Sequence, residues 1–453
     1  MKIFAQRAYC KEGWNQNVRI TIEAGKIVQI ALNSSAKDGD IRVDTLMPAL
    51  ANVHSHSFQR AMAGMTEYRA KGRESFWTWR DLMYRFLHRL TPDHIAPIAA
   101  QTFMEMQKAG YASVGEFHYI HNQPDGARYA NPAELSEQIM AAAKTAGIGL
   151  THLPVLYSYG GVDGRALTGG QLRFANDLGA FSDLVSRCKT VAKDVHDDTI
   201  VGIAPHSLRG SSTADIAEIL SMHKDGPVHI HIAEQVKEVE DINAALGARP
   251  VEHLLDHAPV DARWCLIHAT HLTEAETTAF AKSGAVAGLC PITEANLGDG
   301  IFNGPTFLQA GGAFGLGSDS NVNISLTEEL RMLEYSQRLR DRERNVLVEG
   351  EGSTGKTLYL GAAKGGAQAL GRTAGRIETG ALADLVAINS QDPTLCALRE
   401  DQLFDGLVFA AKDTVVTDLW SAGRHQVQAG RHTAEEKITT AYRAAISDLT
   451  SDI

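Results

Sequence analysis

Two histidines separated by one residue, His54 and His56, stand at the end of an apolar run in the segment LMPALANVHSHSFQR. If this run forms a strand, both side chains point to the same face, because side chains alternate along a strand. Two imidazoles on one face of a buried element could hold one side of a metal ion. They could equally be incidental polar residues where a strand reaches water, since histidine is often half-buried without being a ligand. The pair alone leaves both interpretations open.

Further metal-binding or titratable side chains follow other apolar runs of the chain. The segment PVHIHIAEQ contains His229, His231 and Glu234. The segment WCLIHATH contains His268, and FGLGSDSN contains Asp319. Several imidazoles and a carboxylate suit a divalent ion such as zinc, with one coordination position left for water. They can act together only if one fold brings the ends of these runs to the same place.

The middle of the chain predicts such a fold. From residue 48 to about 370, short apolar runs such as ASVGEFHY, TIVGIAPHS and AVAGLCPI alternate with segments of helical spacing. Repeated strand–helix units imply a parallel sheet, and about eight of them imply a (β/α)8 TIM-like barrel of the α/β class. Reactive side chains of such a barrel sit at the carboxyl ends of its strands, which is where the polar residues fall.

Both ends of the chain have β patterns. One segment alternates apolar and polar residues around Ala24–Gly25, and another does so around Ala422–Gly423, which is typical of hairpins. We therefore predict a small β-sandwich domain formed by both termini, residues 1–47 and 371–453, the latter ending in a helix. The barrel domain, residues 48–370, is inserted into it.

Composition argues against several classes of function. The chain has 453 residues and a formal net charge of −11, and no Lys/Arg-rich stripe offers a surface for nucleic acid. No apolar run approaches the roughly 18 residues of a membrane span. Five scattered cysteines without a Cys-x-x-Cys pair fit a reducing compartment. We expect a cytoplasmic protein without nucleic-acid or membrane partners, and a homodimer as the commonest oligomer.

Taken together, the motifs resemble the amidohydrolase superfamily. Its signature is His-x-His after the first strand, single histidines after the fifth and sixth, and an aspartate after the eighth. Within it, the chain is most similar to the deiminases that act on N-formimino-L-glutamate. The segments that carry this likeness are NVHSHSFQRAMAG, SFWTWRDLMY, GEFHYIH, APHSLRG, HIAEQ, CPITEANLGDG and GSDSNV. The resemblance covers essentially the whole chain and implies hydrolysis of N-formimino-L-glutamate to N-formyl-L-glutamate and ammonia, a step of histidine degradation.

The resemblance implies one divalent metal ion, expected to be Zn²⁺, although the same donors also accept iron or manganese. The implied ligands are His54, His56, His231 and Asp319. Many members of the superfamily bridge two metals with a carbamylated lysine on the fourth strand, and TIVGIAPHS has no lysine, which favours one metal. His229 is expected to be structural. The histidines of helical or terminal segments are expected to be solvated, namely His88, His94, His223, His257 and His425.

The resemblance also implies three catalytic residues. Asp319 would accept a proton from the attacking water, and Glu234 would pass that proton to the departing nitrogen. His268 would hydrogen-bond the water or the developing charge. The alternative for Glu234 is a surface carboxylate at the start of a helix, and the alternative for His268 is a satisfied core histidine.

The implied substrate is a small dianion, and planar guanidinium groups bind carboxylates bidentately. The resemblance places five residues in the substrate pocket: Gln59, Arg80, Tyr119, His206 and Arg209. From the residues alone, Arg80 fits the surface of an amphipathic helix equally well. Which arginine would receive which carboxylate stays open.

One competing motif lies in residues 350–357, where GEGSTGKT matches the phosphate-binding pattern G-x-x-x-x-G-K-[ST]. A phosphate loop follows a buried parallel strand, whereas the preceding residues here form a charged helical pattern. We therefore expect a surface loop before a helix.

Other members of the superfamily are the remaining alternatives. Guanine-type deaminases and triazine hydrolases share the metal set, but two arginines favour an acyclic dianion over a flat neutral base. Metal-free assembly proteins of the superfamily would have no chemical use for the full set of histidines and carboxylates.

Overall fold

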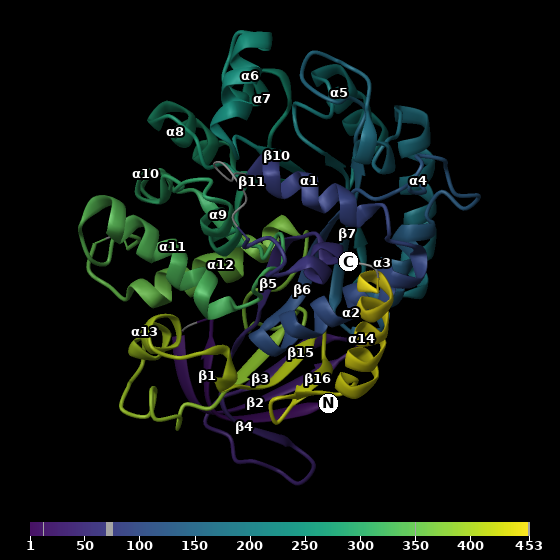
Figure 1. Ribbon diagram of the computed structural model, residues 1–453. Helices are drawn as coiled ribbons and strands as arrows, with labels where there is room; N and C mark the ends of the chain where they lie inside the picture. The colour runs from purple at the N-terminus through teal and green to yellow at the C-terminus, as the bar shows by residue number, and fades with distance from the viewer. Residues whose placement is uncertain (12, 69–75, 349, 452–453) are drawn as a thin grey trace.

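The computed structural model describes residues 1–11, 13–68, 76–348 and 350–451, which form two sheets with helices packed around one of them (Figure 1). Strands of the first sheet pair in parallel along the whole path of the sheet. They are β5 Leu50–Ser55, β6 Tyr111–His118, β7 Gly149–Leu156, the short pair β8 Ile200–Val201 and β9 Ala204–Pro205, β10 Val228–Ile232, β11 Trp264–His268, β12 Val286–Leu289 and β13 Ala313–Leu316.

This parallel sheet closes into a barrel between the β8–β9 segment and β10. Ile203 forms a parallel bridge with Val228. The backbone N–H of His229 donates to the carbonyl of Ile203, and that of His231 donates to the carbonyl of His206, each at 3.1 Å. With β8 and β9 counted as one position, eight parallel strands form the ring, and the predicted (β/α)8 barrel is confirmed.

The barrel strands are shielded on both faces. Every residue of β5, β6, β7, β10, β11 and β12 is buried. Helices cover the outside of a closed parallel sheet and opposing strands cover the inside, so such strands form near-continuous apolar runs. The helices of the described residues are α1 Phe76–Leu87, α2 Pro92–Ala109, α3 Glu134–Ala146, α4 Leu178–Val191, α5 Thr213–Met222, α6 Val236–Leu246, α7 Pro250–His257, α8 Glu274–Ser283, α9 Pro291–Leu297, α10 Gly304–Gln309, α11 Leu326–Asp341, α12 Thr354–Ala369, α13 Gln402–Phe409 and α14 Glu435–Thr450.

The end of α12 closes the floor of the barrel. The hydroxyl of Thr151, on β7, donates to the carbonyl of Leu370 at 2.9 Å. His229, on β10, places its Nε2 2.8 Å from the carbonyl of Ala369. Two side chains inside the barrel therefore satisfy backbone carbonyls at a helix end, which would otherwise be buried without partners.

Both ends of the chain form the second sheet, in the order β17, β16, β15, β14, β4, β1, β2, β3. Its strands are β1 Lys2–Cys10, β2 Gly13–Glu23, β3 Lys26–Ala31, β4 Ile41–Pro48, β14 Leu385–Ile388, β15 Val416–Ser421, β16 Arg424–Gln428 and β17 Arg431–His432. Because β4 pairs directly with β14, N-terminal strands in purple lie beside C-terminal strands in yellow-green at the bottom of Figure 1.

Two predicted hairpin turns, one near each end of the strand order, bring the two halves of the second sheet together. Ala24–Gly25 and Ala422–Gly423 all have positive φ angles, as type I′ hairpin turns require. The turns lie against one another, since a Cβ on Gly25 would meet the carbonyl oxygen of Ala422 at 2.9 Å. Inward side chains of the two halves, such as Ile20 and Trp420, share one core. The β-sandwich predicted from both termini is confirmed.

Buried ion pairs connect the sandwich to the barrel. The Arg372 guanidinium, whose side chain is 0% exposed, lies 3.0 Å from Asp384 and 2.9 Å from Asp198. Arg424 reaches Asp198 at 2.6 Å. Asp198 stands just before β8 of the barrel, whereas the other three residues belong to the segment that forms the C-terminal half of the sandwich. Charged groups that are largely enclosed and paired in this way connect the two parts.

Two of the histidines expected to be solvated are buried, so that prediction was wrong for them. His94 is 8% exposed, with Nδ1 accepting the N–H of Thr91 and Nε2 lying 2.8 Å from Asp448 of α14. His223 is 6% exposed and its ring packs on Phe181. Both lie in helical patterns, but packing against distant segments buries them.

The phosphate-loop match leads into the start of α12, and the residues there bind one another. Asp405 accepts hydrogen bonds from the Ser353 hydroxyl and the Gly355 N–H, both at 2.8 Å. The Lys356 ammonium lies 2.8 Å from Asp401. Carboxylates of this chain thus bind the groups that a phosphate would need, which fits the expected loop before a helix better than a phosphate site.

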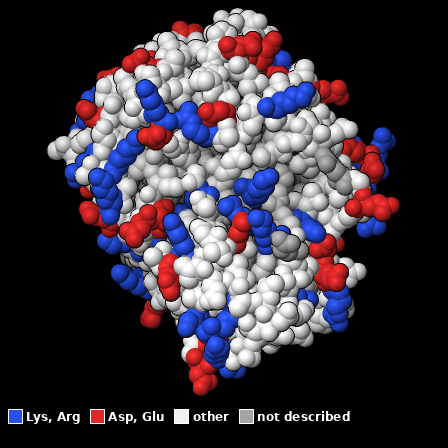
Figure 2. Space-filling model, turned by 180° about the vertical axis from the view of Figure 1, so that it is seen from behind, with Lys and Arg blue, Asp and Glu red and all other residues white. Residues whose placement is uncertain are grey.

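The outer surface adds two observations. No helix of the described residues is both long enough and apolar enough to cross a membrane. Basic and acidic side chains are interspersed over the face that Figure 2 shows.

Candidate functional site

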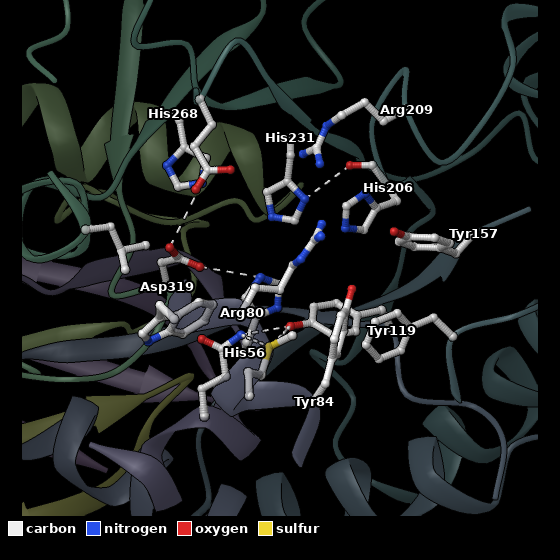
Figure 3. Close-up of a pocket in the computed structure, with 16 residues that line it drawn as sticks. His56, Arg80, Tyr84, Tyr119, Tyr157, His206, Arg209, His231, His268 and Asp319 are labelled. Atoms are coloured by element: carbon white, nitrogen blue, oxygen red, sulfur yellow. Dashed lines mark hydrogen bonds and ion pairs between the residues drawn. The ribbon is translucent and has the colours of Figure 1, made fainter. Parts of the chain in front are cut away.

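Four of the predicted site residues meet at the carboxyl end of the barrel. His54 lies on β5 and His56 directly follows it, His231 lies on β10, and Asp319 follows β13. The Nε2 atoms of His54 and His231 are 3.0 Å apart. Asp319 Oδ1 lies 3.3 Å from His54 Nε2 and 3.4 Å from His56 Nε2. All four side chains are buried, and Figure 3 shows His56, His231 and Asp319 turned toward one another.

The donor atoms of this cluster fit a cation. His56 Nδ1 lies 2.9 Å from the carbonyl of Phe117, and His231 Nδ1 lies 3.1 Å from the carbonyl of His206. Since each Nδ1 must donate to its carbonyl, each Nε2 carries a lone pair directed into the cluster. Burial lowers the pKa of His54 to about 3 and lowers the pKa values of His56 and His231 as well. Neutral imidazoles with converging lone pairs, beside a carboxylate, are a typical divalent-metal site.

His268 and Glu234 lie at the edge of the cluster. His268 ends β11, and its Nε2 is 3.8 Å from Glu234 Oε1 and 4.0 Å from Asp319 Oδ2. Burial alone would lower the pKa of His268, but the surrounding carboxylates, Glu234 first, raise it to about 10. Burial raises the pKa of Glu234 to about 7. Neither residue is exposed: their residual exposures are 1% and 5%, which excludes a surface position for Glu234.

Several residues of the site have a strained backbone. Ala233, His268 and Asp319 have φ angles of 53°, 69° and 44°, a left-handed region that residues other than glycine adopt uncommonly, alanine less often than histidine or aspartate. Each stands at or just after the end of a barrel strand. Strain of about 1–3 kcal/mol per residue persists only where neighbours hold it, and it concentrates at functional sites.

All five predicted substrate residues line the cavity above the cluster. Figure 3 shows Arg80, Tyr119, His206 and Arg209 facing this space. Arg80 belongs to α1, Tyr119 follows β6, and His206 and Arg209 follow β9. Segments far apart in the sequence thus bring two guanidinium groups and the histidine–aspartate cluster to one cavity.

Arg209 has a buried carboxylate behind it. Its guanidinium lies 3.9 Å from Glu238 Oε2, and Glu238 also accepts the backbone N–H groups of Ala233 and Glu234 at 3.2 and 3.1 Å. Although burial opposes it, Glu238 raises the pKa of Arg209, so the guanidinium stays charged. Glu238 therefore contacts both the loop that contains Glu234 and the guanidinium of Arg209.

Polar and aromatic side chains complete the wall. The Gln59 amide donates to the Tyr119 hydroxyl at 2.8 Å, while Gln59 Oε1 has no hydrogen-bond partner among the described residues. The Arg80 guanidinium lies 5.5 Å from the ring centre of Tyr84. Sequence reasoning missed Tyr84, which belongs to the quoted segment SFWTWRDLMY, and Tyr157, which follows β7.

Glu294 was also missed, although its segment CPITEANLGDG was noted for the family likeness. Its Oε1 lies 3.3 Å from His268 Nδ1. No spacing rule marks it, because it stands within a helix, α9, and contacts the site through His268. The ligand atoms of His268, Cys290 and Glu294 lie within 4.8 Å of one another.

The family follows from comparison with known proteins. A model of the amidohydrolase family matches residues 45–425, and a model described as the N-terminal domain of formimidoylglutamate deiminase HutF matches residues 1–44. The chain belongs to the amidohydrolase family, as its motifs predicted. A curated relative, formimidoylglutamate deiminase of Pseudomonas aeruginosa, is 48% identical over 450 residues, 99% of both chains.

Solved structures agree with this assignment. A crystal structure of an amidohydrolase from Brucella melitensis covers 99% of both chains with 46% identity and a TM-score of 0.94. An adenosine deaminase from Xanthomonas campestris, solved with bound zinc, has 21% identity and a TM-score of 0.80 over 99% of this chain and 98% of its own. At that identity the likeness concerns the fold alone.

Proposed function

We propose that this chain hydrolyses N-formimino-L-glutamate to N-formyl-L-glutamate and ammonia. One observation carries the proposal: Arg80 and Arg209 face the same cavity as the histidine–aspartate cluster. Two guanidinium groups suit a substrate with two carboxylates, and the cluster suits hydrolysis of a carbon–nitrogen bond. The curated relative that is 48% identical over its full length is named for this deimination.

The metal ligands we propose are His54, His56, His231 and Asp319, holding one ion that we expect to be zinc. When bound, such an ion supplies a Lewis acid that lowers the pKa of water from 15.7 toward about 7. The convergence of the Nε2 lone pairs supports this ligand set. The fourth strand position, residues 200–205, contains no lysine that could bridge a second ion.

Protons must be moved within the site, because the amidinium substrate and water give an amide and ammonium without net release of a proton. We assign the first acceptor role to Asp319, whose carboxylate lies beside the cluster, 3.3 Å from His54 Nε2 and 3.4 Å from His56 Nε2. Glu234 then carries the proton to the departing nitrogen, which must leave as ammonia. A carboxyl group with a pKa of about 7 can take up and release a proton near neutral pH.

His268 stabilises the charge that develops during attack. Its raised pKa keeps it a donor through Nε2, which faces Glu234 and Asp319. A preorganised donor in a buried site costs no solvent reorganisation at the moment of reaction.

Recognition of the rest of the substrate falls to the upper wall of the cavity. Arg209, fixed near Glu238, and Arg80 bind the two carboxylates, and the pair of Gln59 and Tyr119 offers neutral hydrogen bonds. Burial raises the pKa of Tyr119 far above its usual range, so its hydroxyl keeps its hydrogen.

A cytoplasmic location and a homodimer stay predictions, and light scattering of the purified protein tests the latter.

The test is product analysis in water enriched in ¹⁸O, with the metal-loaded protein and N-formimino-L-glutamate. We expect one equivalent of ammonia and one ¹⁸O atom in the formyl group of N-formyl-L-glutamate. Formation of L-glutamate and formamide would place hydrolysis at the other carbon–nitrogen bond and contradict the proposal.

A further inference from the structure

His268 is contacted on both edges of its ring. On one edge, Nε2 faces Glu234 and Asp319 at 3.8 and 4.0 Å. On the other edge, Nδ1 lies 3.3 Å from Glu294 Oε1. The partner of one imidazole nitrogen fixes the orientation of the ring and the hydrogen that the other nitrogen presents. The orientation of the His268 ring, and thus the direction in which Nε2 points, therefore depends on its contact with Glu294.

Glu294 is itself held by the first turn of α9. The Cys290 N–H donates to Glu294 Oε1, and the Glu294 N–H donates to the Cys290 carbonyl, both at 2.9 Å. Cys290 directly follows β12, so the carboxylate is tied to a barrel strand. Glu294 is 5% exposed and does not line the cavity that holds the arginines.

The backbone of His268 needs such a partner. Its φ of 69° is left-handed, and Ala269 after it also has a positive φ of 48°. Positive φ angles at two consecutive residues are strained, and such a backbone persists only where contacts with neighbouring residues hold it. The direction of the His268 side chain must therefore be set by its contacts. Of the contacts to the His268 ring nitrogens, the one with Glu294 is the shortest among the described residues.

We propose that Glu294 is a positioning residue for the hydrolysis: its carboxylate accepts the Nδ1 hydrogen of His268 and holds Nε2 toward Glu234 and Asp319. The inference rests on the proposed function, which supplies the reaction to be measured. Glu294 acts through His268 and touches neither substrate nor metal ligands.

Two other roles for Glu294 predict different results. A residue that only caps α9 would affect stability and leave turnover of the folded protein unchanged. A cation ligand, together with Cys290 and His268, would change the metal content, because these three side chains place their ligand atoms within 4.8 Å of one another.

The test compares Glu294→Ala with a control carboxylate that binds the same helix, α9, from a neighbouring one. Glu329 of α11 is 0% exposed and accepts the N–H of Ile292 in α9 at 2.9 Å, without a contact to His268 among the described interactions. We expect Glu294→Ala to lower kcat roughly 10- to 100-fold with KM within twofold of wild type. Glu294→Gln, which keeps an oxygen acceptor, should recover most of kcat. Glu329→Ala should leave kcat within twofold.

A double-mutant cycle shows whether Glu294 acts through His268. In a His268→Ala background, Glu294→Ala should lower kcat by less than twofold, because the ring that it positions is gone. If Glu294→Ala does not fold, Glu294→Met replaces it, since methionine has a similar size and cannot accept the hydrogen bond in the same way.

A second readout does not depend on turnover. Long-range ¹H–¹⁵N spectra of protein with ¹⁵N-labelled histidines report which ring nitrogen carries hydrogen, and His268 is assigned by its loss in the His268→Ala variant. We expect a hydrogen on Nδ1 of His268 in wild type and a changed pattern for this ring in Glu294→Ala. An unchanged ring signal would overturn the inference.

The kinetic outcomes separate the inference from the proposed function. If wild type releases no ammonia from N-formimino-L-glutamate, the proposed function fails, and the ring spectra alone decide about Glu294. If wild type is active, a kcat of Glu294→Ala within twofold of wild type overturns the inference. The inference is also overturned if Glu294→Ala lowers kcat by the same factor in the His268→Ala background as in wild type. It is overturned as well if the Glu294→Ala variant loses one bound metal equivalent.

Discussion

The Nε2 atoms of His54 and His231 lie 3.0 Å apart inside the barrel. The Nδ1 hydrogen of His231 is already given to the carbonyl of His206, so its Nε2 lone pair points toward His54. Burial keeps both rings neutral by lowering their pKa values. Two neutral Nε2 acceptors at this distance are stabilised when a cation binds to both of them and to the carboxylate of Asp319.

Metal removal should abolish ammonia release and lower the melting temperature, because a ligand that binds only the folded state stabilises it. Added zinc should restore both. His231→Gln should bind less than a tenth of the metal that wild type binds. His229→Gln is the matched control, since His229 lies on the same strand but contacts the carbonyl of Ala369. Equal metal loss in both variants, measured by elemental analysis, would contradict the ligand assignment.

Arg209→Met should lower kcat/KM for N-formimino-L-glutamate roughly 10- to 100-fold, because a hydrogen bond to a charged group contributes about 1.5–3 kcal/mol. Metal content should stay at the wild-type value, since Arg209 lies outside the ligand cluster. Steady-state kinetics and elemental analysis on the same preparation check both. Loss of metal together with activity would make Arg209 a structural residue instead.

Glu234→Gln should lower kcat by about 10²–10⁴-fold, the usual contribution of a positioned proton carrier. Gln has the size of Glu but cannot carry the proton to the departing nitrogen. Binding should change little, so KM should remain within a few-fold of wild type. A variant that keeps more than half of the wild-type kcat would show that another group delivers the proton.

Asp198→Asn should destabilise the protein by about 2–3 kcal/mol at neutral pH, because it removes one of the two carboxylates that pair with the buried Arg372. Urea unfolding measures this, with the exposed Asp163→Asn as a control that should change stability by less than about 0.5 kcal/mol.

The same carboxylate gives a pH dependence with a defined sign. Burial alone would raise the pKa of Asp198, but Arg424 and Arg372 lower it to about 2 in the folded state, against about 3.9 in an unfolded chain. Its contribution of about 2–3 kcal/mol is therefore complete above about pH 4 and is lost as the pH falls toward 2. The stability difference between wild type and Asp198→Asn should shrink over that interval, and a constant difference would contradict the assignment.

The barrel and the meeting of its histidine–aspartate cluster could be predicted because their signals are local. His54 and His56 share a strand face by simple alternation, and His231 and Asp319 stand at or after the ends of apolar runs that become strands of the same barrel. The hairpin turns at Ala24–Gly25 and Ala422–Gly423 are likewise set by adjacent residues.

Residues whose role depends on distant packing could not be found in this way. The partner of His94, Asp448, lies 354 residues away, so only the docking of α14 on α2 reveals that His94 is buried. Glu294 is 26 residues from His268 and stands in a helical pattern that has no catalytic signature. The role proposed for Glu294 depends on the contact between the end of β11 and helix α9, which no local sequence pattern specifies.

The most direct measurement of the central claim is ammonia release by metal-loaded protein from N-formimino-L-glutamate, N-formimino-L-aspartate and guanine at equal concentration. We predict release from the glutamate compound with a kcat/KM at least about tenfold above that of the aspartate compound, since a shorter chain cannot reach both Arg80 and Arg209. Guanine should release none. Release from guanine alone would keep the metal site and contradict the assigned substrate and the role of both arginines.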